Sequence, residues 1–285
     1  MFAIIGIVVV LAAVVGGYLM EHGNLSVLFQ PAEVVIIGGA ALGAFLIASP
    51  RTVVAATLRG ALRVFTGKEA GRETYMELLM LLYELLVLAR KEGVRAIEAQ
   101  VNDPSSSPVF GRYPRIQGNH EVSAFICDNF KVFMAGGLEP LYLDSLMELD
   151  MDTQHAEEQA PSGAVSKVAD SLPGLGIVAA VLGVVLTMGK IKEPPEVLGH
   201  SIGAALVGTF LGVLLCYGFV GPMAHNLENR ARDHQAMLGV VKASILAYAQ
   251  GIAPVLALEA GRRAVPTSLR PSYAELEGAM RGVKK

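Results

Sequence analysis

Four apolar runs divide the chain, and the polar stretches between them differ greatly in length. The runs cover residues 2–20, 34–49, 172–189 and 201–220, and none contains Asp, Glu, Lys or Arg. At about 1.5 Å per residue, a helix of about 20 residues crosses the hydrocarbon core of a bilayer. The second run is the shortest, and the preceding Pro31 and Ala32 can extend it. The pattern predicts an all-α membrane protein with four transmembrane helices.

The polar stretches set the predicted domain organisation. The turns after the first and third runs are short, whereas the stretch between the second and third runs is long. We therefore expect spans one and two in 1–49, a large helical cytoplasmic domain in 50–171, a hairpin of spans three and four in 172–222, and a helical tail in 223–285.

Two parts of the long segment have the apolar spacing of helices. Residues 74–100 follow this period, and Glu77 and Glu84 interrupt the apolar positions. We expect a helix in the core of a polar domain there, rather than a fifth span. Residues 121–150 predict further helix, with a break at Gly136–Gly137.

The remaining stretches predict less regular structure. Residues 102–118 are rich in Pro, Ser and Gly and predict an exposed loop. Residues 151–163 indicate a polar connector leading into span three. In the tail, a helical period over 227–252 predicts that span four continues as an amphipathic helix. We expect the polar, proline-containing end, 262–285, to be mobile.

Basic residues predict the orientation of the spans. Of the 23 Lys and Arg residues, 12 fall in 50–171 and 9 in 223–285, which leaves only Lys190 and Lys192. Short cytoplasmic loops carry the excess of positive charge in membrane proteins. We expect both termini and the long segment to be cytoplasmic and the two short turns to face outward.

A basic amphipathic stretch follows the second span directly. It is expected to lie against anionic lipid head groups, so membrane lipid is one predicted partner. Its basic residues are Arg51, Arg59, Arg63 and Lys68.

Composition excludes several classes of protein. The mean hydropathy is +0.49, and charged residues make up only 17% of the chain, as in integral membrane proteins. No basic block is longer than two residues, which argues against nucleic acid as a partner. Cys127 falls in the polar segment and Cys216 in an apolar run, which argues against a disulfide between them.

Sequence motifs give no support for an enzyme, a cofactor or a metal site. The six histidines have no HxxH or HExxH spacing. Gly174 and Gly176 imitate part of a dinucleotide-binding fingerprint, but no strand precedes them and a span follows. Helix packing explains these glycines better.

The spans themselves offer two further observations. An ion pathway normally contains an ionisable side chain, and the four apolar runs have none, so a partner would have to supply it. Small side chains also recur every four residues in the last two runs. They either pack within one subunit or form a smooth wall for a partner's helix. These residues are Ala179, Gly183 and Thr187 in one run and Ala204, Gly208 and Gly212 in the other.

Two prolines and one charged stretch are candidates for a functional role. Pro173 suits the first turn of span three, and Pro222 would interrupt the helix that leaves span four. Both are predicted to lie at one membrane face, where they could transmit a change in span tilt. Arg90 and Glu98 lie in a charged stretch that ordinarily forms a solvated face, and Gly93 permits a turn between them.

Several of these motifs together resemble the MotA family of bacterial flagellar stator subunits, over essentially the whole chain. They are the five residues 16–20, Gln-Pro-Ala-Glu at 30–33, the stretch 90–98, Leu-Pro-Gly-Leu-Gly-Ile-Val-Ala-Ala-Val-Leu-Gly at 172–183 and Gly-Pro at 221–222. The resemblance implies five copies around two MotB subunits in the inner membrane. It also implies that MotB, a single-span peptidoglycan-binding protein, supplies the protonatable Asp.

Site residues follow from the same resemblance. It implies that Arg90 and Glu98 contact the rotor protein FliG, and that Pro173 and Pro222 couple ion passage to movement. Asp150 is a third candidate for rotor contact, although it stands where close relatives have Glu.

The resemblance also bears on the ion. Ala180 stands where sodium-driven relatives have Thr, and Thr209 matches a hydroxyl on the ion pathway. Together they favour protons. Two alternatives remain: a sodium-driven PomA-like stator, and an ExbB/TolQ-type energiser of outer-membrane processes, which would have three spans.

Overall fold

The computed structural model describes residues 2–67, 70–137 and 139–283, and the described part is helical without strands. Four helical segments in it are long and apolar enough to cross a membrane, as predicted. The chain forms two compact units, each built from two stretches of sequence. Unit one comprises residues 1–67 and 157–229, and unit two comprises 68–156 and 230–285. These units therefore cut across the four consecutive segments expected from the sequence.

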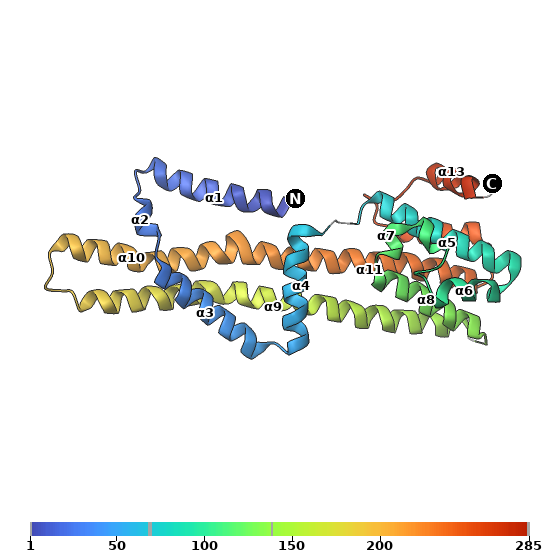
Figure 1. Cartoon of the computed structure of the whole chain (residues 1–285), viewed down its shortest axis with the longest axis horizontal. Helices are drawn as coiled ribbons and strands as arrows, with labels where there is room; N and C mark the ends of the chain where they lie inside the picture. Colours follow the sequence, from blue (N-terminus) through green and yellow to red (C-terminus); the bar gives the residue numbers. More distant parts are fainter. Residues whose placement is uncertain (1, 68–69, 138, 284–285) are drawn as a thin grey trace. The chain divides into compact units, whose positions relative to one another are not determined.

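Unit one contains two of the candidate membrane-spanning helices whole and parts of the other two (Figure 1). Its first four helices are α1 (Phe2–Met20), α2 (Leu25–Leu28), α3 (Pro31–Ala48) and α4 (Arg51–Thr66). The hairpin is formed by the later part of α9 (Pro140–Met188), by α10 (Pro195–Leu214) and by a π-helical turn, η3 (Leu215–Val220). Helix α3 packs against α10, and α1 contacts α4 and η3.

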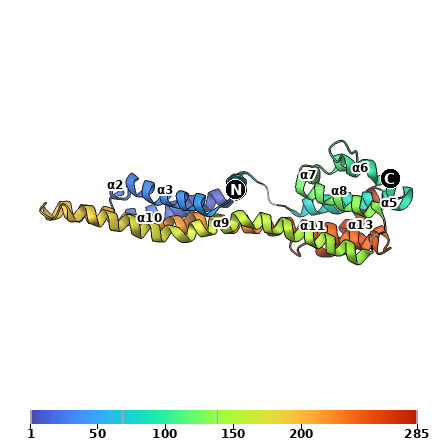
Figure 2. The ribbon, with the colours of Figure 1, turned by 90° about the horizontal axis from the view of Figure 1, so that it is seen from below.

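Unit two is a helical domain with its own apolar core. Its early helices are α5 (Arg72–Glu92), η1 (Val94–Ile97), α6 (Glu98–Asn102), η2 (Phe110–Arg112), α7 (Pro114–Gln117) and α8 (His120–Ala135). The start of α9 and the end of α11 (Gly221–Ala249) join them, followed by α12 (Pro254–Ala264) and α13 (Tyr273–Val283). Figure 2 shows these elements from a second side.

Helix α5 lies at the centre of this core, which confirms that it is not a fifth span. Ten of its residues are buried, including both Tyr75 and Tyr83. Helices α12 and α13 pack against it from the end of the chain. Burial of this many large side chains is the main stabilising contribution to unit two.

The connector predicted for 151–163 is wrong, because α9 runs without a break through this stretch. Pro161 and the polar residues around it suggested an interruption. However, buried residues continue on both sides of it, from Met147 and Met151 to Val165 and Ala169. Their packing offsets the roughly 3 kcal/mol that a proline costs inside a helix.

The tail is also more ordered than the sequence suggested. Residues 254–264 and 273–283 form α12 and α13, and Leu276 and Met280 of α13 are buried in the core. Ser272 caps α13 through Glu275, and Glu275 forms an ion pair with Arg72 of α5.

Candidate functional site: an exposed charged corner and a glycine-lined hairpin

Arg90 and Glu98 lie on one exposed corner of unit two. Arg90 is in the last turn of α5, and Glu98 is the first residue of α6. Gly93 ends α5 with φ of +87°, a conformation that glycine adopts without steric cost. Among the described residues, no hydrogen bond or ion pair engages either charged side chain. Both charges are therefore available to a binding partner.

The helix that carries Arg90 is fixed by half-buried and exposed polar contacts. The Tyr113 hydroxyl donates a hydrogen bond to Glu84 Oε1 at 2.5 Å, and Arg112 donates to Glu84 Oε2 at 2.9 Å. Burial, together with the bond to Glu84, raises the pKa of Tyr113 above its usual value. About two to three turns earlier in α5, Arg115 bridges Glu77 and Glu73. These contacts tie α5 to the segment 110–117 and hold the corner in place.

Asp150 lies apart from this corner in the polar contact network. It is half-buried on α9, and its Oδ1 accepts a hydrogen bond from Gln154 at 2.9 Å. No hydrogen bond or ion pair joins it to Arg90 or Glu98 in the part of the chain described. Its role in rotor contact stays a prediction.

The two prolines stand in continuous helical backbone. Pro173 lies inside α9, so the prediction that it occupies the first turn of span three is wrong. The interruption expected at Pro222 takes the form of the π-helical turn η3, whose last bond runs from the Gly221 N–H to the Cys216 carbonyl. Proline has no N–H donor, and its ring clashes with the preceding turn of an α-helix. The wider π turn accommodates both effects.

Small residues bring α9 and α10 into backbone contact. A Cβ built on Gly212 would lie 2.5 Å from the Leu172 carbonyl oxygen and 2.9 Å from the Gly176 Cα. A Cβ on Gly183 would lie 2.7 Å from the Ala205 Cβ. Gly183, Gly208 and Gly212 of the small-residue pattern therefore pack within the hairpin.

The predicted ion-pathway residues flank this contact. A Cβ on Gly208 would lie 3.1 Å from the Ala180 backbone nitrogen, and one on Gly176 would lie 3.3 Å from the Thr209 Cα. Ala180 is buried and Thr209 is half-buried. The structure thus brings Ala180 and Thr209 to the same helix crossing.

The sequence reasoning missed Glu33. We expected it in the outward turn and expected all spans to be free of acidic residues. Instead, α3 begins at Pro31, and Glu33 lies inside the second candidate span with only 8% of its surface exposed. The Gln-Pro-Ala-Glu motif contained the signal, because Pro is common at the first position of a helix.

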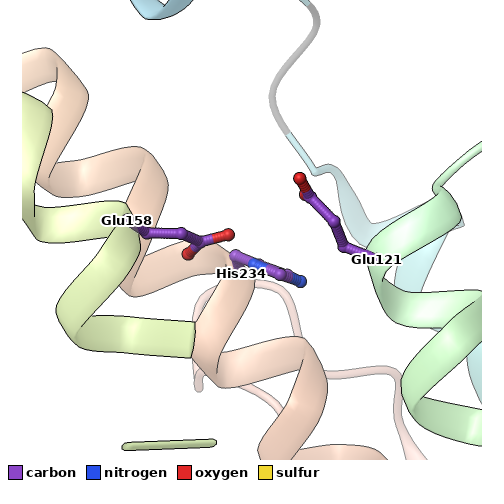
Figure 3. A group of neighbouring side chains, drawn as sticks. All are labelled: Glu121, Glu158 and His234. Carbon is purple, nitrogen blue, oxygen red and sulfur yellow. The ribbon is translucent and has the colours of Figure 1, made fainter. Parts of the chain in front are cut away.

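The sequence pattern did not indicate a second group of residues either, because its members are far apart along the chain. Figure 3 shows Glu121 on α8 and His234 on α11, and their ligand atoms lie within 4.8 Å of one another. Glu158, drawn with them, belongs to the other compact unit. Within unit two only two potential ligands meet, which is fewer than a protein zinc site uses.

Comparisons with known proteins place the chain in a family. Residues 4–93 match the family model for the N-terminal part of motility protein A, and residues 118–239 match that of the MotA/TolQ/ExbB proton channel family. Motility protein A of Escherichia coli (strain K12) is 39% identical over 284 residues, which cover 100% of this chain and 96% of the relative. Chemotaxis protein LafT of Vibrio parahaemolyticus is 33% identical over 273 residues, with 96% of each chain covered.

Solved structures agree with this assignment at the level of the fold. The C. jejuni MotAB structure matches 95% of this chain and 98% of the compared chain, with a TM-score of 0.79 at 19% identity. The flagellar MotAB stator complex of Bacillus subtilis matches 97% and 98%, with a TM-score of 0.75 at 24% identity. From its full-length similarity to motility protein A, the chain belongs to the MotA family.

Proposed function

We propose that this chain is the ion-conducting stator subunit of a bacterial flagellar motor. With MotB it forms a proton channel that converts ion flow into torque on the rotor protein FliG. The observation that carries the proposal is the 39% identity to motility protein A over the full length, together with four candidate spans. An ExbB/TolQ-type energiser would have three spans, so the span count favours the stator.

The proposed assembly is five copies of this chain around two MotB helices in the inner membrane, with both termini cytoplasmic. The distribution of Lys and Arg supports this orientation. Helix α4 supports a contact with anionic lipid, since exposed Leu58, Leu62 and Phe65 share a helix with Arg59 and Arg63. In this arrangement α4 lies along the cytoplasmic surface of the bilayer.

The energy source is the proton gradient. A charge that moves down the membrane potential releases about 2.3 kcal/mol per 100 mV. Protonation of an Asp on MotB removes its charge and changes which ring wall it prefers. The ring then steps around MotB, and Arg90 and Glu98 move past the rotor. Ala180, where sodium-driven relatives have Thr, supports protons over sodium.

The π-helical turn and Pro173 supply a mechanical link in this proposal. Both stand in helices that run from the membrane-spanning unit into the other unit. A π turn is a local departure from α-helical geometry and is often found at functional sites. A change in the spans at these positions would therefore be passed along α9 and α11.

The test separates rotor contact from conduction. Arg90→Glu should abolish swimming, because it reverses an exposed charge at the rotor surface, while proton conductance of an unplugged complex stays unchanged. Lys131→Glu is the matched control, since Lys131 is exposed and, within the described residues, its ion pair is with its neighbour Asp128 on α8. Loss of conductance together with swimming in Arg90→Glu would count against this assignment of roles.

A further inference from the structure

Glu33 lies between α3 and the α9–α10 hairpin, within unit one. A Cβ built on Gly208 of α10 would lie 2.5 Å from Glu33 Oε2, and one on Gly183 of α9 would lie 3.8 Å from Oε1. The carboxyl group therefore occupies the space that a side chain at position 208 would fill, and it lies at ordinary contact distance from position 183.

The carboxyl group has no polar partner. Glu33 Oε2 is buried without a hydrogen-bond partner, and no ion pair among the described residues involves Glu33. An ionised carboxylate without a counter-charge costs several kcal/mol in hydrocarbon. A carboxyl group held there must either carry a proton or acquire a cation.

In the described part of the chain, no ion pair gives the carboxyl group a counter-charge. The side chains next to Gly208 and Gly183 include those of Ala179 and Ala205, which are small and apolar. The titratable residues of these elements within unit one lie elsewhere along the helices, and none pairs with Glu33. They are Glu157, Glu158, Lys167 and Asp170 on α9 and Glu196 and His200 on α10.

The carboxyl group lies toward one end of the candidate spans. Glu33 is in the first turn of α3, and at 1.5 Å per residue Gly183 is about 7 Å from the end of α9 at Met188, whereas Gly208 is about 20 Å from the start of α10 at Pro195. Gly208 also contacts Ala179 and the Ala180 backbone. The acid therefore stands beside the residues predicted to line the ion pathway.

We infer that the Glu33 carboxyl group is a proton-binding site of this chain, and that proton conduction depends on it. It takes up one proton to become a carboxylic acid and returns to the carboxylate when it passes that proton on. The conduction part rests on the proposed function. Proton conduction by the complex would then use two kinds of carboxyl group: an Asp on MotB and Glu33 of each copy of this chain.

Infrared difference spectra between acidic and alkaline buffer test the site directly, with the full chain in lipid vesicles. The expected result is a carboxyl C=O band that shifts in D₂O and disappears in Glu33→Gln. Glu196→Gln is the control, because Glu196 is exposed in the first turn of α10, and it should retain the band. In Gly208→Ala the added Cβ would crowd Oε2 and should shift the band, so the test does not rely on a single variant.

Proton flux into liposomes that contain the complex with MotB tests the dependence. Glu33→Gln should lower the flux by at least roughly tenfold, as expected when a positioned proton-transfer group is removed. Glu33→Asp should conduct better than Glu33→Gln, and Glu196→Gln should conduct like the unmodified complex.

Three results would overturn the inference. The first is that Glu33→Gln removes no carboxyl band from the spectra, and the second is that the Glu33→Gln complex conducts at the unmodified rate. The third is a band that follows the sodium concentration instead of pH, because it would make Glu33 a cation site. If the unmodified complex conducts no protons, the proposed function fails, while the spectra still decide whether Glu33 binds a proton.

Discussion

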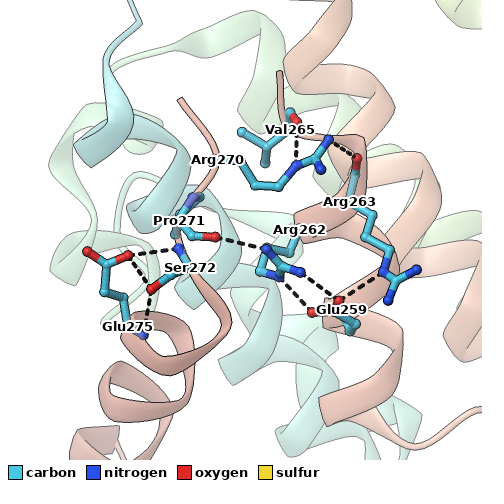
Figure 4. Close-up of polar contacts among 8 residues, drawn as sticks. All are labelled: Glu259, Arg262, Arg263, Val265, Arg270, Pro271, Ser272 and Glu275. Atoms are coloured by element: carbon cyan, nitrogen blue, oxygen red, sulfur yellow. Dashed lines mark hydrogen bonds and ion pairs between the residues drawn. The ribbon is translucent and has the colours of Figure 1, made fainter. Parts of the chain in front are cut away.

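At the scale of single residues, a few ionised side chains account for much of the polar stabilisation of unit two. Lys242 of α11 bridges Asp144 and Glu148 of α9. Glu259 of α12 accepts hydrogen bonds from Arg262 at 2.7 Å and Arg263 at 2.9 Å (Figure 4). The Lys242 contacts join two helices that are distant in the sequence, so the sequence pattern did not single them out. The Glu259 contacts are i,i+3 and i,i+4 pairs within α12.

Glu259 makes unit two sensitive to acid. Its hydrogen bonds with Arg262, and then with Arg263, lower its pKa from 4.5 to about 2 despite burial. This shift corresponds to roughly 3 kcal/mol of stabilisation, which is fully present above pH 4.5 and is lost as the pH falls toward 2. The Arg262 guanidinium also donates to the Pro271 carbonyl at 2.9 Å, so the loss extends to the segment before α13.

Thermal unfolding of Glu259→Gln and the unmodified chain at several pH values measures this contribution. The variant should be less stable at neutral pH, and the difference should shrink as the pH falls below 4.5. Glu277→Gln is the control, since Glu277 forms an exposed i,i+4 pair with Arg281 that contributes little. A stability difference that does not change with pH would contradict the argument.

At the scale of elements, apolar periodicity was enough to locate the four spans and the core helix α5. It failed where a helix contains polar residues and proline, as in 151–163. It also failed at Glu33, because span two was predicted from the charge-free run, which begins at Val34, whereas α3 begins at Pro31. The burial of Glu33 depends on Gly183 and Gly208, which lie about 150 residues or more further along the chain. A linear pattern does not record that proximity.

The contact between α9 and α10 depends on the absence of side chains at the crossing. Gly212→Ala would place a Cβ 2.5 Å from a backbone carbonyl oxygen, so the two helices must move apart. Overpacking of this kind typically costs about 1–3 kcal/mol. Gly174→Ala is the matched control, because a Cβ there meets no atom within 4 Å.

The melting temperature of each variant in detergent checks this prediction. Gly212→Ala should melt below the unmodified chain, and Gly174→Ala should melt at or above it, since alanine favours helix over glycine. Equal melting temperatures for the two variants would show that the crossing is not tightly packed.

At the scale of the whole molecule, the proposed function would divide two tasks between the two compact units. Unit one holds two candidate spans whole, parts of the other two, Glu33 and the predicted ion pathway, and unit two presents Arg90 and Glu98 at its surface. Helices α9 and α11 contribute residues to both units without a break. In the proposed function, a continuous helix is the simplest element by which movement in the spans would reach the predicted rotor contact. The fold and the family followed from the sequence, but the discontinuous units did not, because their boundaries lie inside helices.

The central claim is that this chain conducts protons only together with a single-span partner that carries an Asp in its membrane segment. Proton flux into liposomes under an imposed membrane potential tests it most directly, for the chain alone and for the co-purified unplugged complex. We expect flux from the complex, no flux above background from the chain alone, and loss of flux when the partner's Asp is replaced by Asn. Comparable flux from the chain alone, or none from the complex, would contradict the stator mechanism.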